Sequence, residues 1–229
     1  MSLTFLLLIL NALQTAQAAF IPVSRSSSSS LSNSSEITLS QLDAIINSTT
    51  CPLKGSESLD ECRTAAQALP FVNKGFSDYN ITSVGEKAAL LSLMSFESGG
   101  FQFNINHFPG NPGQGTRNLM EFPAGPTSYA SLSSLPNTLS NQTKNAIRAV
   151  VLGDGLSFAS AMWFYTQSGA TQIGQPGQGC TQIAGLVQGL QAQTEAGWEH
   201  YITDCVGTTV TDERREDYLR TLTILNGNT

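Results

Sequence analysis

The sequence predicts a mainly α-helical domain of the α+β kind, in which strands are few and short. Apolar residues recur three and four positions apart in several segments between residues 39 and 225, which is the spacing of amphipathic helices. Ser83 stands three residues before Glu86 and the apolar run that follows, the pattern of a capping box at a helix start. No segment keeps the apolar–polar alternation of a half-buried strand.

Taken in order, helices are expected over residues 39–46, 59–71, 83–96, 140–152, 155–165, 182–193 and 212–225. The second is expected to end at Pro70, because proline lacks the N–H that a helix interior needs. The third is expected to stop at Gly99 and Gly100, since glycine is the usual left-handed residue after a helix. Residues 101–106, which follow directly, are the best candidate for a strand or an extended loop.

Three parts are expected along the chain. Residues 1–18 have the apolar run and the small-residue cleavage pattern Ala16-Gln17-Ala18 of a secretory signal peptide. Residues 19–38 form a serine-rich leader that cannot bury enough apolar surface to fold. Residues 39–229 are then about 190 residues, enough for one domain that buries roughly 70% of the surface its unfolded chain exposes.

Two further features indicate a secreted, extracellular protein. Four N-glycosylation sequons are present, beginning at Asn33, Asn47, Asn80 and Asn141. Four cysteines make an even set for an oxidising compartment and allow three pairings. Of these three connectivities we favour the one in which both disulfides close short loops, namely Cys51–Cys62 with Cys180–Cys205. Neither the cysteine spacing nor any other pattern calls for a metal or an organic cofactor.

The charge of the chain limits its partners. The formal net charge is −6 and the pI is about 4.8, and no basic patch interleaved with aromatic residues occurs, so nucleic acid is not an expected partner. An anionic membrane surface is disfavoured by the same charge, and no later segment reaches the ~20 apolar residues of a membrane span. A cationic polymer such as chitosan would be favoured.

The residue types narrow the chemistry to carboxylates. His107 and His200 are the two histidines, and they do not form the pair on one helix that a zinc protease needs. Residues 155–159, Gly-Leu-Ser-Phe-Ala, lack the strand–turn–helix context of a nucleophile elbow. Glu97 lies in the last turn of the third predicted helix, at the negative end of the helix dipole and among apolar neighbours. Both effects are expected to raise its pKa, as a general acid requires.

The segment around Glu97 resembles a known superfamily. Residues 88–100, Ala-Ala-Leu-Leu-Ser-Leu-Met-Ser-Phe-Glu-Ser-Gly-Gly, resemble the helix-plus-Glu-Ser signature of goose-type lysozymes and lytic transglycosylases. Residues 115–123, Gly-Thr-Arg-Asn-Leu-Met-Glu-Phe-Pro, resemble the Gly-Leu-Met-Gln-x-x-Pro segment of that superfamily, and Tyr129 follows at a matching distance. Residues 161–165 resemble the aromatic helix that lines the cleft, and residues 198–214 resemble a secreted fungal branch.

This resemblance implies a lysozyme-like fold with a substrate cleft and a secreted glycosidase (a lysozyme, lytic transglycosylase or chitosanase-like enzyme). It would cleave β-1,4 bonds in a cell-wall polysaccharide that contains N-acetylglucosamine. Glu97 would protonate the glycosidic oxygen, and Glu121, or else Asp154, would activate water on the far face. Without a second carboxylate, the acetamido group of the substrate would assist. The sequence departs from the family at Glu121, where the family has Gln, and at Asn118, where it has Gly.

These departures favour an alternative, a non-catalytic secreted glycan-binding or effector protein on the same fold. Sugar binding needs flat aromatic surfaces and amide or hydroxyl groups, and the candidates are Phe101, Asn104, Asn106, Arg117, Asn118, Tyr129, Trp163 and Tyr165. The aromatic run at residues 163–165 equally fits a packed core. The expected partner is a polysaccharide, with peptidoglycan first and chitin or chitosan next, and the protein is expected to be a monomer.

Overall fold

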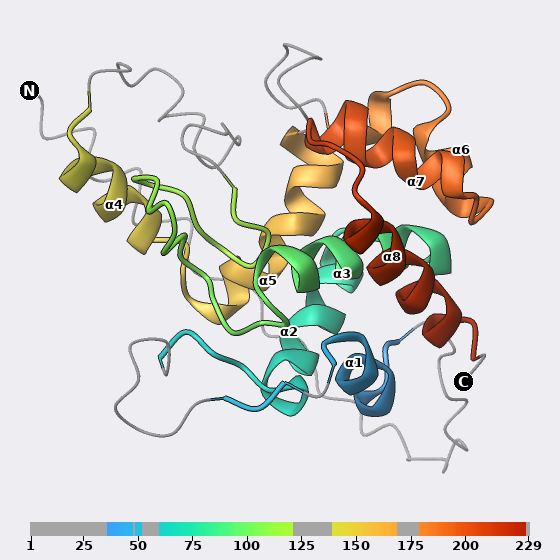
Figure 1. Cartoon of the computed structure of the whole chain (residues 1–229), viewed down its shortest axis with the longest axis horizontal. Helices are drawn as coiled ribbons and strands as arrows, with labels where there is room; N and C mark the ends of the chain where they lie inside the picture. The colour runs from blue at the N-terminus through green and yellow to red at the C-terminus, as the bar shows by residue number, and fades with distance from the viewer. Residues whose placement is uncertain (1–35, 48, 52–59, 121–138, 169–178, 228–229) are drawn as a thin grey trace, which may run out of the picture. The chain divides into compact units, whose positions relative to one another are not determined.

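The computed structural model describes residues 36–47, 49–51, 60–120, 139–168 and 179–227, all within a compact unit that spans Ser34–Thr229. This part is mainly helical, as predicted (Figure 1). The helices are α1 (Leu39–Ile45), α2 (Ala65–Asp78), α3 (Val84–Glu97), α4 (Asn141–Ala149), α5 (Asp154–Trp163), α6 (Leu186–Gln191), α7 (Glu195–His200) and α8 (Asp212–Leu225). Two π-helical segments, η2 (Phe164–Ser168) and η4 (Tyr201–Val206), continue α5 and α7, and the 3-10 segment η3 (Cys180–Gln182) precedes α6.

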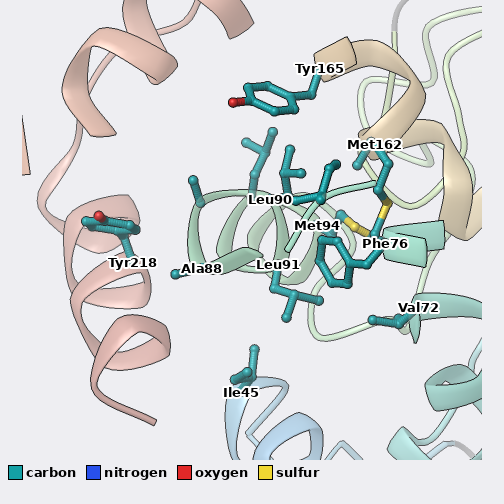
Figure 2. Close-up of a cluster of buried hydrophobic side chains, with 14 of the residues drawn as sticks. Ile45, Val72, Phe76, Ala88, Leu90, Leu91, Met94, Met162, Tyr165 and Tyr218 are labelled. Carbon is teal, nitrogen blue, oxygen red and sulfur yellow. The ribbon is translucent and has the colours of Figure 1, made fainter. Parts of the chain in front are cut away.

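Helix α3 is the centre of the core. Every residue from Gly85 to Ser95 is buried, and α3 packs against α1, α5, α6 and α8. In Figure 2 its Leu91 side chain extends toward Ile45 of α1, and Met94 lies beside Phe76 of α2 and Met162 of α5. Its apolar residues do not keep to one face, so the helix has to be enclosed by other elements. Its start is as predicted, because the Ser83 hydroxyl accepts a hydrogen bond from the Glu86 backbone N–H.

Helix α2 shows where the sequence prediction was wrong. It begins at Ala65, capped by Thr64 and Gln67, and it continues through Pro70 to Asp78. Residues 60–63 are not helical, and Cys62 among them is bridged to Cys51. Proline removes one backbone hydrogen bond, but α2 then buries Val72 and Phe76 in the core, and this packing sustains the helix past Pro70.

Other boundaries also differ from the prediction. Helix α7 was not predicted, because its six residues are too few to show a helical repeat. The segment predicted over residues 182–193 is α-helical only over Leu186–Gln191, after η3 and a turn that leaves Gly185 at φ 80°. Residues 101–106 form no strand, and the loop that contains them has only single bridges, from Ile105 to Gly115 and from Gly115 to Met120.

Helix α8 docks through three arginines that reach three different helices. Arg214 pairs with Glu97 at the end of α3, and Arg215 pairs with Glu195 and Glu199 of α7. Arg220 donates to the carbonyl oxygens of Ala44 and Ile45 at the end of α1, at 2.7 and 2.9 Å. In α8 itself Tyr218 and Thr221 are the buried residues. The helix is therefore held by polar contacts from its first turn and its middle, and by Tyr218 with the partly buried Leu222, Ile224 and Leu225, which pack against the core.

Helices α3, α6 and α7 approach one another at glycines. Gly189 of α6 faces Gly197 of α7, where an added Cβ on Gly197 would lie 2.6 Å from the Gly189 Cα. An added Cβ on Gly85 of α3 would lie 2.9 Å from the carbonyl carbon of Leu190 in α6. Both distances are too short for any side chain, so these backbones pack in direct contact.

Two disulfides, Cys51–Cys62 and Cys180–Cys205, join segments 11 and 25 residues apart. These are the pairings that the sequence analysis favoured, and they are compatible with a secreted or extracellular protein. Within the described residues no single helix has the length and apolar character of a membrane span. Only the bent pair of Asn141–Ala149 and Asp154–Gln167 passes that test, by length and composition alone.

Helices α1 and α2 are both followed by an asparagine in the left-handed conformation, Asn47 at φ 57° and Asn80 at φ 52°. Both begin predicted sequons and are exposed, as is Asn141 at the start of α4; Asn33 lies outside the described residues. We expect Asn80 to carry an N-linked glycan when the protein is secreted by a eukaryotic host, because its amide and Thr82 both face solvent.

Two variants distinguish the effect of losing the glycan from the effect of changing the residue at the end of α2. Asn80→Gly removes the acceptor and keeps a residue that favours the left-handed conformation, whereas Thr82→Ala keeps Asn80 and removes the sequon. Intact-mass measurement should show each variant lighter than the secreted wild type by one glycan, with unfolding midpoints close to that of the deglycosylated wild type. Unmodified Asn80 in the secreted protein would contradict this expectation.

Candidate functional site

Glu97, the predicted general acid, is held in an ion pair. It is the last residue of α3, its side chain is 21% exposed, and its Oε1 accepts from Arg214 Nη1 at 2.7 Å. The Arg214 guanidinium also lies over the Phe96 ring, 4.3 Å from the ring centroid. The neighbouring residues in the sequence predicted apolar surroundings at this helix end, and they give no sign of Arg214, which lies 117 residues further along the chain.

One signal for this pair exists in the sequence. Glu97 stands at the negative end of its own helix dipole, and Arg214 stands in the first turn of α8, at the positive end. Each side chain has the same sign of charge as the end of the helix dipole at which it stands, which is unfavourable. The ion pair between them offsets this cost where the two helix ends meet. The pair therefore joins α3 to α8.

Two buried tyrosines, Tyr165 and Tyr201, pack against each other in the core. Tyr201 is fully buried, and its ring meets the Tyr165 ring edge to face at 6.1 Å. The Tyr165 hydroxyl donates to Glu86 Oε1 at 2.8 Å, whereas the Tyr201 hydroxyl has no hydrogen-bond partner in the described part of the chain. Burial, and then the charges of Glu86 and Glu97 respectively, raise the pKa of Tyr165 and of Tyr201 far above the usual 10. Burial raises the pKa of Tyr218 in α8 to about 12.

These raised pKa values predict unfolding at high pH. A phenol whose pKa is higher in the folded state stabilises the fold fully below pH ~10, and this stability is lost as the pH rises through the folded pKa. We expect the free energy of unfolding to fall steeply above pH ~10. Phenolate absorbance and circular dichroism should then change together for Tyr165, Tyr201 and Tyr218. Ionisation of all tyrosines near pH 10 with the circular dichroism unchanged would contradict this.

Arg117, a predicted sugar-binding residue, is fully buried. Its guanidinium acts as a bracket, by which we mean that it ties together the backbone of three residues in and next to its own loop. Its Nη1 donates to the carbonyl oxygens of Phe101 and Phe103, at 2.8 and 3.1 Å, and its Nη2 donates to that of Glu61. The guanidinium lies over the Phe158 ring, 4.9 Å from its centroid. Burial, and then the neighbouring Arg63, lower the pKa of Arg117 to about 10, still a cation at neutral pH.

Arg117 belongs to a polar cluster that we define as Glu61, Arg63, Asn104, His107, Arg117 and Asp154. Glu61 Oε2 accepts from the backbone N–H groups of Asn104 and Ile105, and Glu61 Oε1 lies 2.7 Å from His107 Nε2. Arg63 Nε donates to Asp154 Oδ2 at 2.7 Å. Asp154, the alternative second carboxylate of the sequence analysis, is therefore engaged in an ion pair. The cluster fastens the loop of residues 99–120 to α5 and to the Cys51–Cys62 disulfide.

The structure brings most of the predicted sugar-binding residues into this loop but buries many of them. Phe101, Asn104, Arg117, Trp163 and Tyr165 are at most 7% exposed and contact the protein itself. Asn106 and Asn118 are partly exposed; Asn118 Oδ1 accepts from Ser160 Oγ of α5 at 2.6 Å. Glu121 and Tyr129 lie outside the described residues.

The tip of the loop carries a feature that the sequence analysis missed. Phe108 is 94% exposed, between the exposed residues His107 and Pro109. Below the tip, Asn106 Oδ1 accepts from Gly110 N at 3.0 Å, and the amides of Asn106 and Asn111 both bond to Gln114. The available signal was a lone aromatic residue within a stretch of turn-forming residues, 106–115.

The cysteines and histidines, which usually bind metals, make other interactions in this structure. All four cysteines are in disulfides, and His200 Nε2 lies 3.0 Å from Asp204 Oδ2, as His107 lies against Glu61. The described ranges contain no group of three or more His, Cys, Asp or Glu residues that could hold a metal ion.

Comparison with known proteins gives one curated relative. No family model matches the chain and no solved structure matches it. The chain is similar to a bifunctional dioxygenase (DOX)-epoxy alcohol synthase (EAS) from Fusarium oxysporum (strain Fo5176), with 35% identity over 154 residues. The match covers 62% of this chain and 11% of that protein, so the chain corresponds to a small part of its relative.

This finding corrects the resemblance to goose-type lysozymes and lytic transglycosylases. The relative is a dioxygenase and epoxy alcohol synthase, not a glycosidase, so the lysozyme-like assignment, the hydrolase activity and the muramidase function were wrong. The motif on which the resemblance rested, Glu-Ser-Gly-Gly at residues 97–100, is a helix end followed by left-handed glycines. Many helices end in this way, so the pattern reports local backbone geometry rather than chemistry.

Proposed function

We propose that this chain is a secreted accessory domain with no oxygenase chemistry of its own. It docks onto the catalytic part of a dioxygenase–epoxy alcohol synthase through the tip of its braced loop, residues His107, Phe108 and Pro109. The observation that carries this proposal is the 94% exposure of Phe108 on a loop that hydrogen bonds hold in place.

The extent of the match supports an accessory role. The 154 matched residues are 11% of the relative, whose name gives two activities, so most of that protein lies outside the match. A domain that makes up so small a share of the larger enzyme can act there as a non-catalytic domain that binds or positions the catalytic part. The described residues of this chain have their own hydrophobic core and two disulfides.

The donor set does not suit oxygen-activating iron. Such iron is held by His, by a Cys thiolate, by Tyr or by carboxylates that leave a position open for the substrate. The cysteines here are all disulfide-bonded, the histidines pair with carboxylates, and the buried tyrosines keep their protons at neutral pH. The donor groups among the residues that the structure describes therefore do not fit a haem or a non-haem iron centre, and no oxygenation step is assigned to them.

Phe108 has the properties of an anchor for a protein partner. Aromatic residues that fill a pocket, surrounded by polar groups that exclude water, supply most of the affinity of protein interfaces. Phe108 shares its loop with Asn106, Asn111 and Gln114, whose side-chain amides bond to one another and to the Gly110 backbone and so fix the loop. A rigid anchor loses little conformational entropy on binding. The net charge of −6 favours a neutral or basic partner surface over an anionic one.

Titration calorimetry tests the docking. The partner is the Fusarium oxysporum protein from which the matching segment has been deleted, and the titrant is this chain with residues 1–18 removed. We expect binding by the wild type and a loss of about 2 kcal/mol, roughly 30-fold in Kd, for Phe108→Ala. The matched control is Leu156→Ala, because Leu156 is also apolar and 57% exposed but lies on α5, and its Kd should change less than threefold.

Three outcomes would overturn the proposal. The first is absence of binding to the deleted enzyme, and the second is equal binding by Phe108→Ala. The third is oxygen consumption or epoxy alcohol formation by this chain alone. Sedimentation with peptidoglycan, chitin and chitosan belongs to the same experiment, because a polysaccharide partner stays a prediction. If Phe108→Ala abolished binding to one of these polymers, the partner of the loop tip would be that polysaccharide and not a protein.

A further inference from the structure

Several buried polar atoms where the loop of residues 99–120 meets α5 lack a hydrogen-bond partner among the residues that the structure describes. They are Asn104 Oδ1, Arg117 Nε, Asp154 Oδ1 and Ser157 Oγ. Native proteins seldom leave such atoms unpaired, and ordered water is the usual partner when no protein group is close.

Three of these residues meet at one place. Asp154 and Ser157 are three residues apart in the first turn of α5, so their side chains share one face of that helix. The Arg117 backbone N–H donates to the Ser157 carbonyl oxygen at 3.3 Å, and Arg117 Nη2 lies 3.9 Å from Asp154 Oδ1. That last distance is too long for a direct hydrogen bond and suits a single bridging molecule.

The charges around this place select the kind of ligand. A cation would meet the guanidinium groups of Arg63 and Arg117, and an anion would meet the Asp154 carboxylate. A small neutral molecule that both donates and accepts hydrogen bonds matches both sides. We propose that a buried water molecule bridges this place, donating to Asp154 Oδ1, accepting from the Arg117 guanidinium and bonding to the Ser157 hydroxyl.

The water completes the attachment of the loop to α5. Arg117 already holds the backbone of Phe101, Phe103 and Glu61, and the water links this bracket to the first turn of α5. This inference is independent of the proposed docking function, because it concerns how the loop is held and not what its tip contacts.

The experiment has a direct and an indirect part. A high-resolution crystal structure should show a density peak at about 2.7–3.2 Å from both Asp154 Oδ1 and an Arg117 nitrogen. Ser157→Ala should then raise the unfolding equilibrium constant about fivefold, because a hydrogen bond to the water is lost. Ser160→Ala provides the comparison, since the Ser160 hydroxyl has the protein partners Asn118 and Ser157 and needs no water.

The sign of the Ser157→Ala effect distinguishes the possibilities. If no water is present, Ser157 has an unpaired buried hydroxyl, and its removal should leave stability unchanged or increased. Such a result would overturn the proposal. A crystal structure in which Arg117 and Asp154 bond directly, or in which an ion occupies the place, would overturn it as well.

Discussion

Gly197→Ala is expected to lower the free energy of unfolding by about 3 kcal/mol or more, at the upper end of the range for an overfilled contact. The new Cβ would lie 2.6 Å from the Gly189 Cα, and the other nearest atoms also belong to the Gly189 backbone. Backbone atoms cannot rotate away as a side chain can, so α6 and α7 would have to separate. Urea unfolding followed by circular dichroism measures the change.

The control for this prediction is another helical glycine. Gly155 in the first turn of α5 has nothing within 4 Å of an added Cβ, so Gly155→Ala should be neutral or stabilise by up to ~1 kcal/mol. Gly85→Ala in α3 should lower the free energy of unfolding as Gly197→Ala does, because its Cβ would meet the Leu190 backbone in α6. Equal unfolding midpoints for Gly197→Ala and Gly155→Ala would show that the helices are not in backbone contact.

Arg117→Met is the second change with a large expected effect, a loss of about 3 kcal/mol or more. Methionine fills much of the same volume, but the carbonyl oxygens of Phe101, Phe103 and Glu61 lose their donor, at about 1–3 kcal/mol for each buried group left unpaired. Arg117→Lys should lose less, because it keeps the charge, although a single ammonium lacks the fork of the guanidinium. Denaturant unfolding and amide hydrogen exchange in the loop measure both variants.

Arg215→Met is the control for the loss of an arginine. Arg215 is 30% exposed and pairs with the half-exposed Glu195 and Glu199, and such surface pairs contribute at most about 1 kcal/mol. We expect Arg117→Met to speed amide exchange throughout residues 101–120, whereas Arg215→Met should leave that exchange unchanged. A smaller loss of stability for Arg117→Met than for Arg215→Met would rule out the bracket role of Arg117.

Helices were predictable from the sequence where caps and apolar spacing agree. The range 212–225 matches α8, which Thr211 caps, and the start of α3 follows from Ser83. Pro70 misled the prediction because the buried residues that sustain α2 lie beyond it. Local pattern reports the intrinsic preference of a segment, and tertiary packing overrides that preference at such places.

The site was less predictable than the fold, because its contacts join residues far apart in the chain. Glu97 was recognised as an unusual carboxylate, but its partner Arg214 comes from α8. Arg117 was predicted to line a sugar-binding cleft, yet its donors face backbone carbonyls within the protein. Spacing along the chain does not tell whether a polar side chain turns outward to a ligand or inward to the backbone.

The attachment of α8 by Arg220 has a consequence for the order of events in folding. Arg220 donates to the last carbonyl groups of α1, which are about 175 residues earlier in the chain. Most all-helical domains fold rapidly because their contacts are local, but here the first described helix gains these partners only once the last one has formed. A ribosome would therefore release nearly the whole domain before α1 is complete, and α1 should be among the last helices to become protected during synthesis.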